Sequence, residues 1–243
     1  MVEKIRPLAF VLVDGLAAYA QPALPLLSQE VKEGRLKQFL VEAAIPTLSY
    51  PNYATIISGL NPEMHQFTDN DHRRPLTSDH FLKKQHRAGR TSAVVGFHWW
   101  RDLLGDDLPA NTLYEAEDTP DHWVFEQAKV MAATFRPDFL LVHPMGVDWA
   151  GHVYGGESPE YLAAATRIDR EIYDFWQWWH LTMSGLLVVG ADHGMGPGHH
   201  HDGNSTREQH VLYFVESGEH LDVEFRYQSQ VQNLFSVLMG EDL

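Results

Sequence analysis

Cysteine is absent from this chain of 243 residues. Its absence excludes disulfide bonds, thiolate metal sites and a cysteine nucleophile. The sequence also has no apolar run long enough to cross a bilayer, and residues 1–7 lack the apolar core and cleavage site of a signal peptide. We therefore expect a soluble cytoplasmic protein that has no membrane partner.

Basic side chains are scarce relative to acidic ones. The chain has 18 Lys and Arg residues against 33 Asp and Glu residues, which gives a formal net charge of -15. Surfaces that bind nucleic-acid polymers or anionic membranes need basic stripes, so neither is an expected partner. A nucleotide substrate is still compatible with this charge, because bound divalent cations reverse the sign of the field inside a site.

Short apolar runs alternate with longer helical patterns along the chain, and the length fits one domain over residues 1–243. The predicted strands are 8–13, 92–97, 138–143, 186–191 and 211–215, and the predicted helices are part of 66–87, 121–135 and 159–180. Residues 98–120, rich in Asp, Pro, Asn and Gly, are expected to be irregular. The alternation predicts an α/β fold with a mostly parallel sheet flanked by helices on both faces.

Carboxylates and imidazoles follow several of these strands. Asp14 follows the first, Asp148 comes soon after the third with His152 four residues later, and Asp192-His193 closes the fourth; the cluster His199-His200-His201 comes next. Open α/β sheets bind ligands beyond the carboxyl ends of their strands, and this ligand set suits zinc or manganese. The alternative is that each Asp caps a helix and each His is a solvated loop residue.

A hydroxyl precedes a predicted helix in the segment 45–60. Pro51 suits the first helical turn, which leaves Ser49 or Tyr50 near the N-terminus of the helix. There a hydroxyl faces the positive end of the helix dipole and unpaired N–H groups, which suits a phosphate. The alternative is an ordinary N-cap serine.

Four motifs occur in a fixed order: Asp14-Gly15; residues 46–52 with 58–65; Asp148-x-x-Gly151-His152-x-x-Gly155; and Asp192-His193-Gly194-Met195. In this order they resemble the nucleotide pyrophosphatase/phosphodiesterase branch of the alkaline phosphatase superfamily, over the chain from Asp14 to about Glu208. The chain is short for that branch, so its substrate-gripping insertions are expected to be reduced.

The resemblance implies two divalent metal ions, zinc or alternatively manganese. One ion would be held by Asp14, Ser49, Asp192 and His193, and the other by Asp148, His152 and a later histidine. Ser49 would be the nucleophile, and Asn52 would bind a phosphoryl oxygen. The segment 201–208 is similar to the phosphoethanolamine transferases of the superfamily, which favours His201 as the later ligand while leaving His199 and His200 open.

The predicted function is a two-metal-dependent phosphodiesterase or nucleotide pyrophosphatase that forms a phosphoserine intermediate on Ser49. Its substrate would be a small phosphate ester, nucleotides included. The alternatives are a phosphomonoesterase or phosphonate hydrolase of the same superfamily, or a non-catalytic metal-binding scaffold. Arg101 and Arg207 are the only basic residues close in sequence to the proposed site, which favours diesters over monoesters. The aromatic residues 97–100 would either stack on a leaving group or pack in a surface loop.

Overall fold

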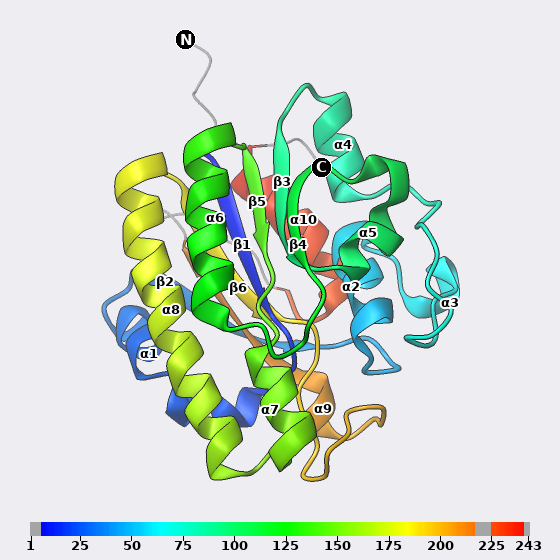
Figure 1. Ribbon diagram of the computed structural model, residues 1–243, viewed down its shortest axis with the longest axis vertical. Helices are drawn as coiled ribbons and strands as arrows, with labels where there is room; N and C mark the ends of the chain where they lie inside the picture. Colours follow the sequence, from blue (N-terminus) through cyan, green and yellow to red (C-terminus); the bar gives the residue numbers. More distant parts are fainter. Residues whose placement is uncertain (1–5, 217–224, 241–243) are drawn as a thin grey trace.

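A computed structural model describes residues 6–216 and 225–240. In these ranges seven strands form one sheet in the order β2-β7-β6-β1-β5-β3-β4 (Figure 1). The strands are β1 (Leu8–Val13), β2 (Leu36–Glu42), β3 (Ser92–Phe97), β4 (Ala110–Tyr114), β5 (Phe139–Val142), β6 (Leu186–Ala191) and β7 (His210–Glu216). Only β7 among them runs against its neighbours, so the mostly parallel sheet is confirmed.

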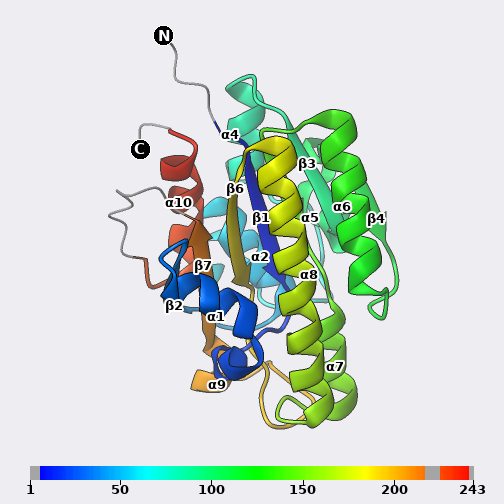
Figure 2. The same cartoon turned by 90° about the vertical axis from the view of Figure 1, so that its left-hand side faces the viewer.

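Helices cover both faces of the sheet, which confirms the predicted α/β class. One face carries α1 (Pro25–Lys32), α6 (Asp121–Phe135) and α8 (Pro159–Met183), and the other carries α2 (Ser49–Ser58), α4 (Phe81–Arg87) and α10 (Val231–Leu238) (Figure 2). Shorter helices join these elements: η1 (Ala18–Ala23), α3 (Pro62–His65), α5 (Trp99–Leu104), η2 (Gly105–Asp107), α7 (Gly146–Tyr154), α9 (Thr206–Gln209) and η3 (Gln228–Gln230). None of the helices in the described ranges is long and apolar enough to span a membrane.

The central strands are buried on both faces, which explains their continuous apolar sequences. Every residue of β1, β5 and β6 is buried between the two helical layers. In α8, the residues Ile168, Ile172 and Trp179, spaced four and seven apart, are completely buried. Burial of these faces is the main driving force that fixes the strand ends in space.

Two edge strands were not predicted from the sequence. β2 exposes Leu40 and buries Leu36 and Val41, so its pattern alternates irregularly and lacks the apolar run of a central strand. The segment 98–120, expected to be irregular, contains α5, η2 and the edge strand β4. Only the last residue of β4, Tyr114, is buried, because an edge strand packs against one neighbour and needs few apolar residues. Of the segment 66–87, which the sequence predicted to be partly helical, only Phe81–Arg87 forms a helix, α4.

The carboxyl ends of β1, β5 and β6 meet at one edge of the sheet, at the lower end in Figure 1, beside α7 and α9. The N-terminus of α2 reaches the same edge, since Ser49 contacts His193 just beyond β6. The fold therefore gathers residues that are far apart in the sequence into one place.

Candidate metal and phosphate site

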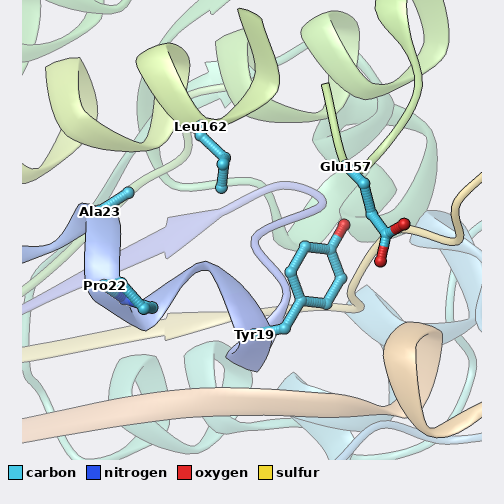
Figure 3. Close-up of a pocket in the computed structure, with 5 residues that line it drawn as sticks. All are labelled: Tyr19, Pro22, Ala23, Glu157 and Leu162. Carbon is cyan, nitrogen blue, oxygen red and sulfur yellow. The ribbon is translucent and has the colours of Figure 1, made fainter. Parts of the chain in front are cut away.

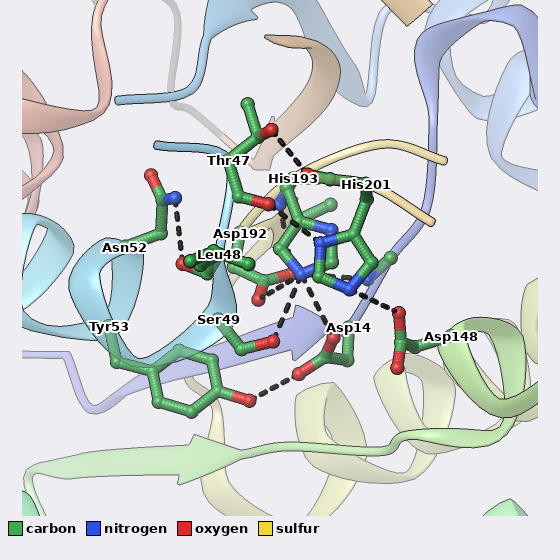
Figure 4. A network of polar contacts seen from close by, with 12 residues as sticks. Asp14, Thr47, Leu48, Ser49, Asn52, Tyr53, Asp148, Asp192, His193 and His201 are labelled. Carbon is green, nitrogen blue, oxygen red and sulfur yellow. Dashed lines mark hydrogen bonds and ion pairs between the residues drawn. The ribbon is translucent and has the colours of Figure 1, made fainter. Parts of the chain in front are cut away.

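Three carboxylates converge at this edge of the sheet with the imidazoles of His193 and His201 (Figure 4). A third imidazole, that of His152, lies beside them. Asp14 directly follows β1 and Asp192-His193 directly follow β6, as their positions after predicted strands suggested. Asp148 lies in the first turn of α7 and His152 in its last turn, four residues apart and so on one helix face. The last imidazole, of His201, comes from the loop before α9.

The first group of ligand atoms consists of Asp14, Asp192 and His193, which are all completely buried. The Nε2 atom of His193 lies 3.4 Å from Asp14 Oδ1 and 3.2 Å from Asp192 Oδ2. The same nitrogen is 3.0 Å from the Oγ atom of Ser49. Four polar side chains thus meet around one point that is closed to solvent.

The second group of ligand atoms consists of Asp148, His193 and His201. It lies next to the first group and shares His193 with it. His201 Nε2 is 3.6 Å from Asp148 Oδ1, and His152 Nε2 is 3.4 Å from Asp148 Oδ2. His152 Nε2 is also 3.1 Å from His201 Nε2. His201 is buried, whereas the side chain of His152, which lies beside this group, is 38% exposed, so the site approaches solvent at His152.

Hydrogen bonds to backbone carbonyls fix the tautomers of these histidines. A carbonyl oxygen only accepts, so each Nδ1 must carry the proton and each neutral ring presents the lone pair of Nε2 to the site. The acceptors are the carbonyls of Gly194 for His193 (2.9 Å), Thr47 for His201 (2.7 Å) and His199 for His152 (2.8 Å). Metal-binding histidines are oriented in the same way.

The carboxylates present unpaired oxygens to the same space. Among the described residues, Asp14 Oδ1, Asp148 Oδ1 and Asp192 Oδ2 are buried and accept no hydrogen bond. Burial and the neighbouring Asp14 and Asp148 charges raise the pKa of Asp192 well above its ordinary value. Buried lone pairs of this kind need a cation to offset them. The donor set therefore fits metal ions, and the two groups are consistent with a binuclear metal centre.

A proton and a metal ion would compete for His152. Its hydrogen bond with Asp148 raises the pKa of His152 to about 9. The facing Nε2 atoms of His152 and His201 repel each other unless a positive charge lies near them. A metal ion would supply that charge in place of the proton.

Asp14 is held in position by a buried network that the sequence did not reveal. Trp100 Nε1 donates to His143 Nδ1 (3.1 Å), which leaves the proton of His143 on Nε2, 3.0 Å from Asp14 Oδ2. The hydroxyl of Tyr53 donates to the same oxygen. Although burial opposes the change, the His143 hydrogen bond and the nearby His193 hold the pKa of Asp14 below its usual range. The available signal was His143 itself, a polar residue that ends a buried strand.

Gly15 allows the two groups of candidate ligand atoms to lie close together. Its φ of +69° is in the left-handed region, and a Cβ atom at this position would lie 2.7 Å from Asp148 Oδ1. The Gly15 N–H also donates to Asp192 Oδ1 (3.1 Å). Any side chain here would push Asp148 away from Asp14 and Asp192.

Ser49 is the first residue of α2, so its hydroxyl lies at the positive end of the helix. Asn52 N–H bonds to Leu48 O, Pro51 has no N–H, and Tyr50 N–H donates to Asn70 Oδ1 (3.0 Å). The N–H of Ser49 has no acceptor in the described part of the chain. One backbone donor beside the hydroxyl is therefore available to an anion.

Asn52 is completely buried and its amide contacts the loop before α2. Its Oδ1 accepts from Ala44 N (2.9 Å), and its Nδ2 donates to Leu48 O (2.9 Å) and Pro46 O (3.1 Å). In this structure Asn52 therefore holds the loop, and its predicted contact with a phosphoryl oxygen stays a prediction. Asn70, which the sequence did not single out, also contacts the first turn of α2, since its Oδ1 accepts from the N–H of Tyr50, the residue after Ser49.

The three consecutive histidines have different surroundings. His201 is buried against Asp148, whereas His199 and His200 are exposed. His199 Nδ1 bonds to the backbone oxygen of His152 (2.7 Å), which ties this loop to α7. Of the three, His201 is the one whose Nε2 faces the site.

A cavity of about 390 Å³ lies apart from these groups, between η1 and the start of α8 (Figure 3). Its walls are formed by Tyr19, Pro22, Ala23, Leu162 and Glu157. Arg207 forms an ion pair with Glu157 at its edge. Arg207, one of the two basic residues that lie close in sequence to the proposed site, is therefore engaged there.

The sequence matches one family model and several curated proteins. A model of the type I phosphodiesterase/nucleotide pyrophosphatase family matches residues 8–114 and 98–227. The catalytic subunit of human GPI ethanolamine phosphate transferase 3 is 24% identical over 242 residues, which cover 89% of this chain and 22% of that protein. An uncharacterized pyrophosphatase/phosphodiesterase of Schizosaccharomyces pombe is 25% identical over 190 residues, 65% of this chain and 38% of that protein. This chain spans about a fifth of the length of the human transferase.

Solved structures share the fold. Murine ectonucleotide pyrophosphatase/phosphodiesterase 5 is 14% identical, with a TM-score of 0.76 over 98% of this chain and 95% of that chain. An inactive threonine-to-alanine variant of the same murine protein, in complex with AMP, gives a TM-score of 0.77 over 98% of this chain and 96% of that one. Phosphonoacetate hydrolase from Sinorhizobium meliloti, in complex with phosphonoformate, is 21% identical, with a TM-score of 0.61 over 78% of this chain and 56% of that one. From the family match and the shared fold, this chain belongs to the type I phosphodiesterase/nucleotide pyrophosphatase family of the alkaline phosphatase superfamily.

Proposed function

We propose that the protein is a two-metal-dependent phosphodiesterase in which Ser49 is the nucleophile. The observation that carries this proposal is the position of Ser49 Oγ, at the N-terminus of α2 and 3.0 Å from His193, the imidazole shared by the two metal-ligand groups. A serine that served only as a helix cap would not need a buried site in which three carboxylate oxygens lack hydrogen-bond partners.

The proposed ligands of one ion are Asp14, Ser49, Asp192 and His193, and those of the other are Asp148, His152 and His201. Three imidazoles favour zinc, and manganese is the alternative. When bound, the ions would lower the pKa of hydroxyl groups and offset the charge of the phosphate. His143 and Tyr53 would act on the first ion only through Asp14, by directing its Oδ1 into the site.

The chain's own groups suit an in-line displacement. Ser49 Oγ would attack phosphorus to form an Oγ–P bond, one ester P–O bond would break, and the proton lost from Oγ would end on the leaving oxygen, which is released as an alcohol. The remaining ester would stay on Ser49 as a phosphoserine adduct until water cleaved the Oγ–P bond. The Ser49 N–H, which lacks an acceptor in the described ranges, would stabilise the developing charge on a phosphoryl oxygen.

The two asparagines near Ser49 should have separable roles. Asn70 uses its Oδ1 on Tyr50, which leaves its amide hydrogens for a phosphoryl oxygen, whereas Asn52 uses both amide ends on the loop 44–48. We expect Asn70→Ala to lower kcat by about tenfold to a hundredfold, and to lower the free energy of unfolding by about 0.5–2 kcal/mol because the Tyr50 N–H loses its acceptor. Asn52→Ala should instead lower the free energy of unfolding by about 1–3 kcal/mol, because it leaves buried backbone groups unpaired. Steady-state kinetics with denaturant unfolding would check both, and a catalytic loss confined to Asn52→Ala would reverse the assignment.

The expected substrates are phosphodiesters, and a nucleoside can supply one arm, since a structural neighbour is described in complex with AMP, the monoester that hydrolysis of such a diester would release. A monoester carries a second negative charge that needs a further cation. Both candidate arginines are engaged elsewhere, Arg101 with Glu115 (3.5 Å) and Arg207 with Glu157. A second candidate, transfer of the adduct to an alcohol instead of water, is supported by the names of the curated transferases that align with most of this chain.

The proposal is tested by turnover of bis(p-nitrophenyl) phosphate and p-nitrophenyl phosphate, with and without added zinc or manganese. We expect metal-dependent hydrolysis, with kcat/KM for the diester higher by about tenfold or more, equivalent to about 1.4 kcal/mol. A monoester preference of that size would favour a phosphomonoesterase. No turnover of either ester with either metal would favour a non-catalytic scaffold. If an added alcohol accepted the phosphoryl group in place of water, the new ester would identify the transferase reaction.

A further inference from the structure

The segment that joins β5 to α7 connects the supports of the two groups of candidate metal ligands. It begins at His143, whose ring bonds to Asp14, and it leads to Asp148 in the first turn of α7. Hydrogen bonds fix its start: the hydroxyl of Tyr114 donates to the His143 carbonyl (2.5 Å), and the N–H of Asp14 donates to the Pro144 carbonyl (3.1 Å). The direction of the Asp148 carboxylate therefore depends on how the far end of this short segment, the first turn of α7, is held.

The first turn of α7 is held by a carboxylate from a different helix. Met145, the residue before α7, provides no side-chain cap. Instead, the N–H of Gly146 donates to Asp121 Oδ1 at 3.0 Å, and Asp121 is the first residue of α6. The N–H groups of a first helical turn need acceptors from outside the helix, and the residue that precedes the helix is the usual source. Here the acceptor lies 25 residues away in the sequence and ties α7 to α6.

The residue type at position 146 is matched to this contact. A Cβ atom on Gly146 would lie 2.4 Å from Asp121 Oδ2, and the three atoms nearest to it would all belong to the Asp121 carboxyl group. The φ angle of Gly146 is not in the left-handed region, so the backbone conformation does not require glycine there. What a side chain at this position would prevent is the close approach of the Asp121 carboxylate.

This contact is kept although it buries a charge. Desolvation raises the pKa of Asp121 to about 6, and the hydrogen bond from the N–H of Gly146 opposes the rise. The carboxylate is therefore still charged at neutral pH. A buried charge costs stability unless it is well paired, and within the described ranges Asp121 forms no ion pair. Ionisable groups whose pKa burial has shifted are concentrated at functional sites.

We propose that Asp121 is a positioning residue for the metal ion held by Asp148, His152 and His201. By fixing the start of α7, its hydrogen bond to Gly146 would set the direction in which Asp148 and His152, on one face of that helix, meet the ion. Asp121 would act only through α7 and would touch neither the substrate nor the ion. The inference rests on the proposed two-metal centre.

The test measures zinc binding by competition with a chromogenic chelator, which requires no turnover. Asp148→Asn removes a proposed ligand and so identifies which binding step belongs to this ion. Asp121→Ala should weaken that step by about tenfold to a hundredfold, the effect expected when a group that orients a metal ligand is removed, and should leave the other step unchanged. Asp121→Asn keeps an oxygen that can accept from the N–H of Gly146, so its affinity should stay within about threefold of the parent.

A matched control is Asp118→Ala, which makes the same change at an exposed residue of the preceding turn. It should bind both ions as the parent does, and thermal unfolding of every variant checks that the fold is kept. Equal affinities of Asp121→Ala and the parent would overturn the proposal. So would a loss spread over both ions, or equal losses in Asp121→Ala and Asp121→Asn.

A double-mutant cycle with Gly146→Ala tests the contact itself. The added methyl group would displace the Asp121 carboxylate, so Gly146→Ala should weaken the same ion by a similar factor. The double variant Asp121→Ala/Gly146→Ala should lose little more than either single variant, because both substitutions remove one contact. Losses that multiply would show that the two residues act independently and would contradict the proposal. If Asp121→Ala failed to fold, unchanged binding of this ion by Gly146→Ala would contradict it equally.

Zinc binding also separates failure of this inference from failure of the proposed function. Two ions bound equally well with and without the Asp121 side chain would reject the positioning role and leave the two-metal centre intact. A parent that binds no ion through Asp148 would reject both. The predicted loss in Asp121→Ala would support the positioning role even if neither p-nitrophenyl ester were hydrolysed.

Discussion

Ser49→Ala should abolish turnover of bis(p-nitrophenyl) phosphate while metal content stays close to that of the parent. The hydroxyl is the proposed attacking group, and loss of a nucleophile of this kind costs on the order of a thousandfold or more in kcat. Ser49 is one of four proposed ligands of its ion, and the others, Asp14, Asp192 and His193, are fully buried and held by their own hydrogen bonds. Turnover kinetics with elemental metal analysis measures both quantities.

A matched control is Ser28→Ala, which removes a hydroxyl from α1, an element on the opposite face of the sheet from α2. It should leave kcat and metal content unchanged. If Ser49→Ala kept near-parent rates, water would attack phosphorus directly and the covalent route would be wrong. If it lost its metals with its activity, Ser49 would be primarily a ligand.

Asp192→Asn should remove at least one metal ion and lower turnover by about a thousandfold. The substitution keeps the size of the side chain and an oxygen able to accept from the N–H groups of Gly15 and His193, but removes the charge that faces the site. Loss of one anionic ligand from a buried centre is worth several kcal/mol of metal affinity and transition-state stabilisation. Asp202→Asn, at an exposed residue of the following loop, serves as the control.

The same variant should be at least as stable as the parent when both are metal-free. Burial and the charges of Asp14 and Asp148 raise the pKa of Asp192 above 3.8 in the folded protein. The folded parent therefore binds its proton more tightly than the unfolded chain, so its stability falls as the pH rises from 3.8 through the raised pKa. Asparagine has no proton to lose, and the advantage of the variant should grow over that range. Denaturant unfolding in the presence of a chelator, at several pH values, measures the difference in stability between the variant and the parent. A metal-free parent that is more stable than the variant at neutral pH would contradict this account of the buried carboxylates.

The sequence predicted the parts of the fold that burial dominates. The strands β1, β3, β5 and β6 have continuous apolar sequences because helices cover both of their faces, and α6 and α8 show clear helical periodicity. The edge strands β2 and β4 escaped prediction because each packs on one side and exposes much of its length. The position of Asp148 on a helix was also missed, since α7 is short and begins only four residues after β5.

The site could be predicted as a set of residues but not as a network. The carboxylates could be predicted as a group because they follow predicted strands, and the carboxyl ends of parallel strands meet at one edge of the sheet. The hydrogen bonds of His143 and Tyr53 to Asp14, and of Asn70 to Tyr50, join segments 20 to 129 residues apart. No local pattern encodes such contacts, and only tertiary packing reveals that Asn52 faces the loop before α2.

The most direct test of the central claim is acid quenching of the protein during turnover of bis(p-nitrophenyl) phosphate, followed by peptide mass analysis. The account predicts a p-nitrophenyl phosphoryl group, attached through Oγ, on the peptide that contains Ser49, and its absence from Ser49→Ala. An adduct on another residue, or no adduct under conditions where pre-steady-state kinetics with excess substrate show a burst of p-nitrophenol, would contradict the proposal that Ser49 is the nucleophile.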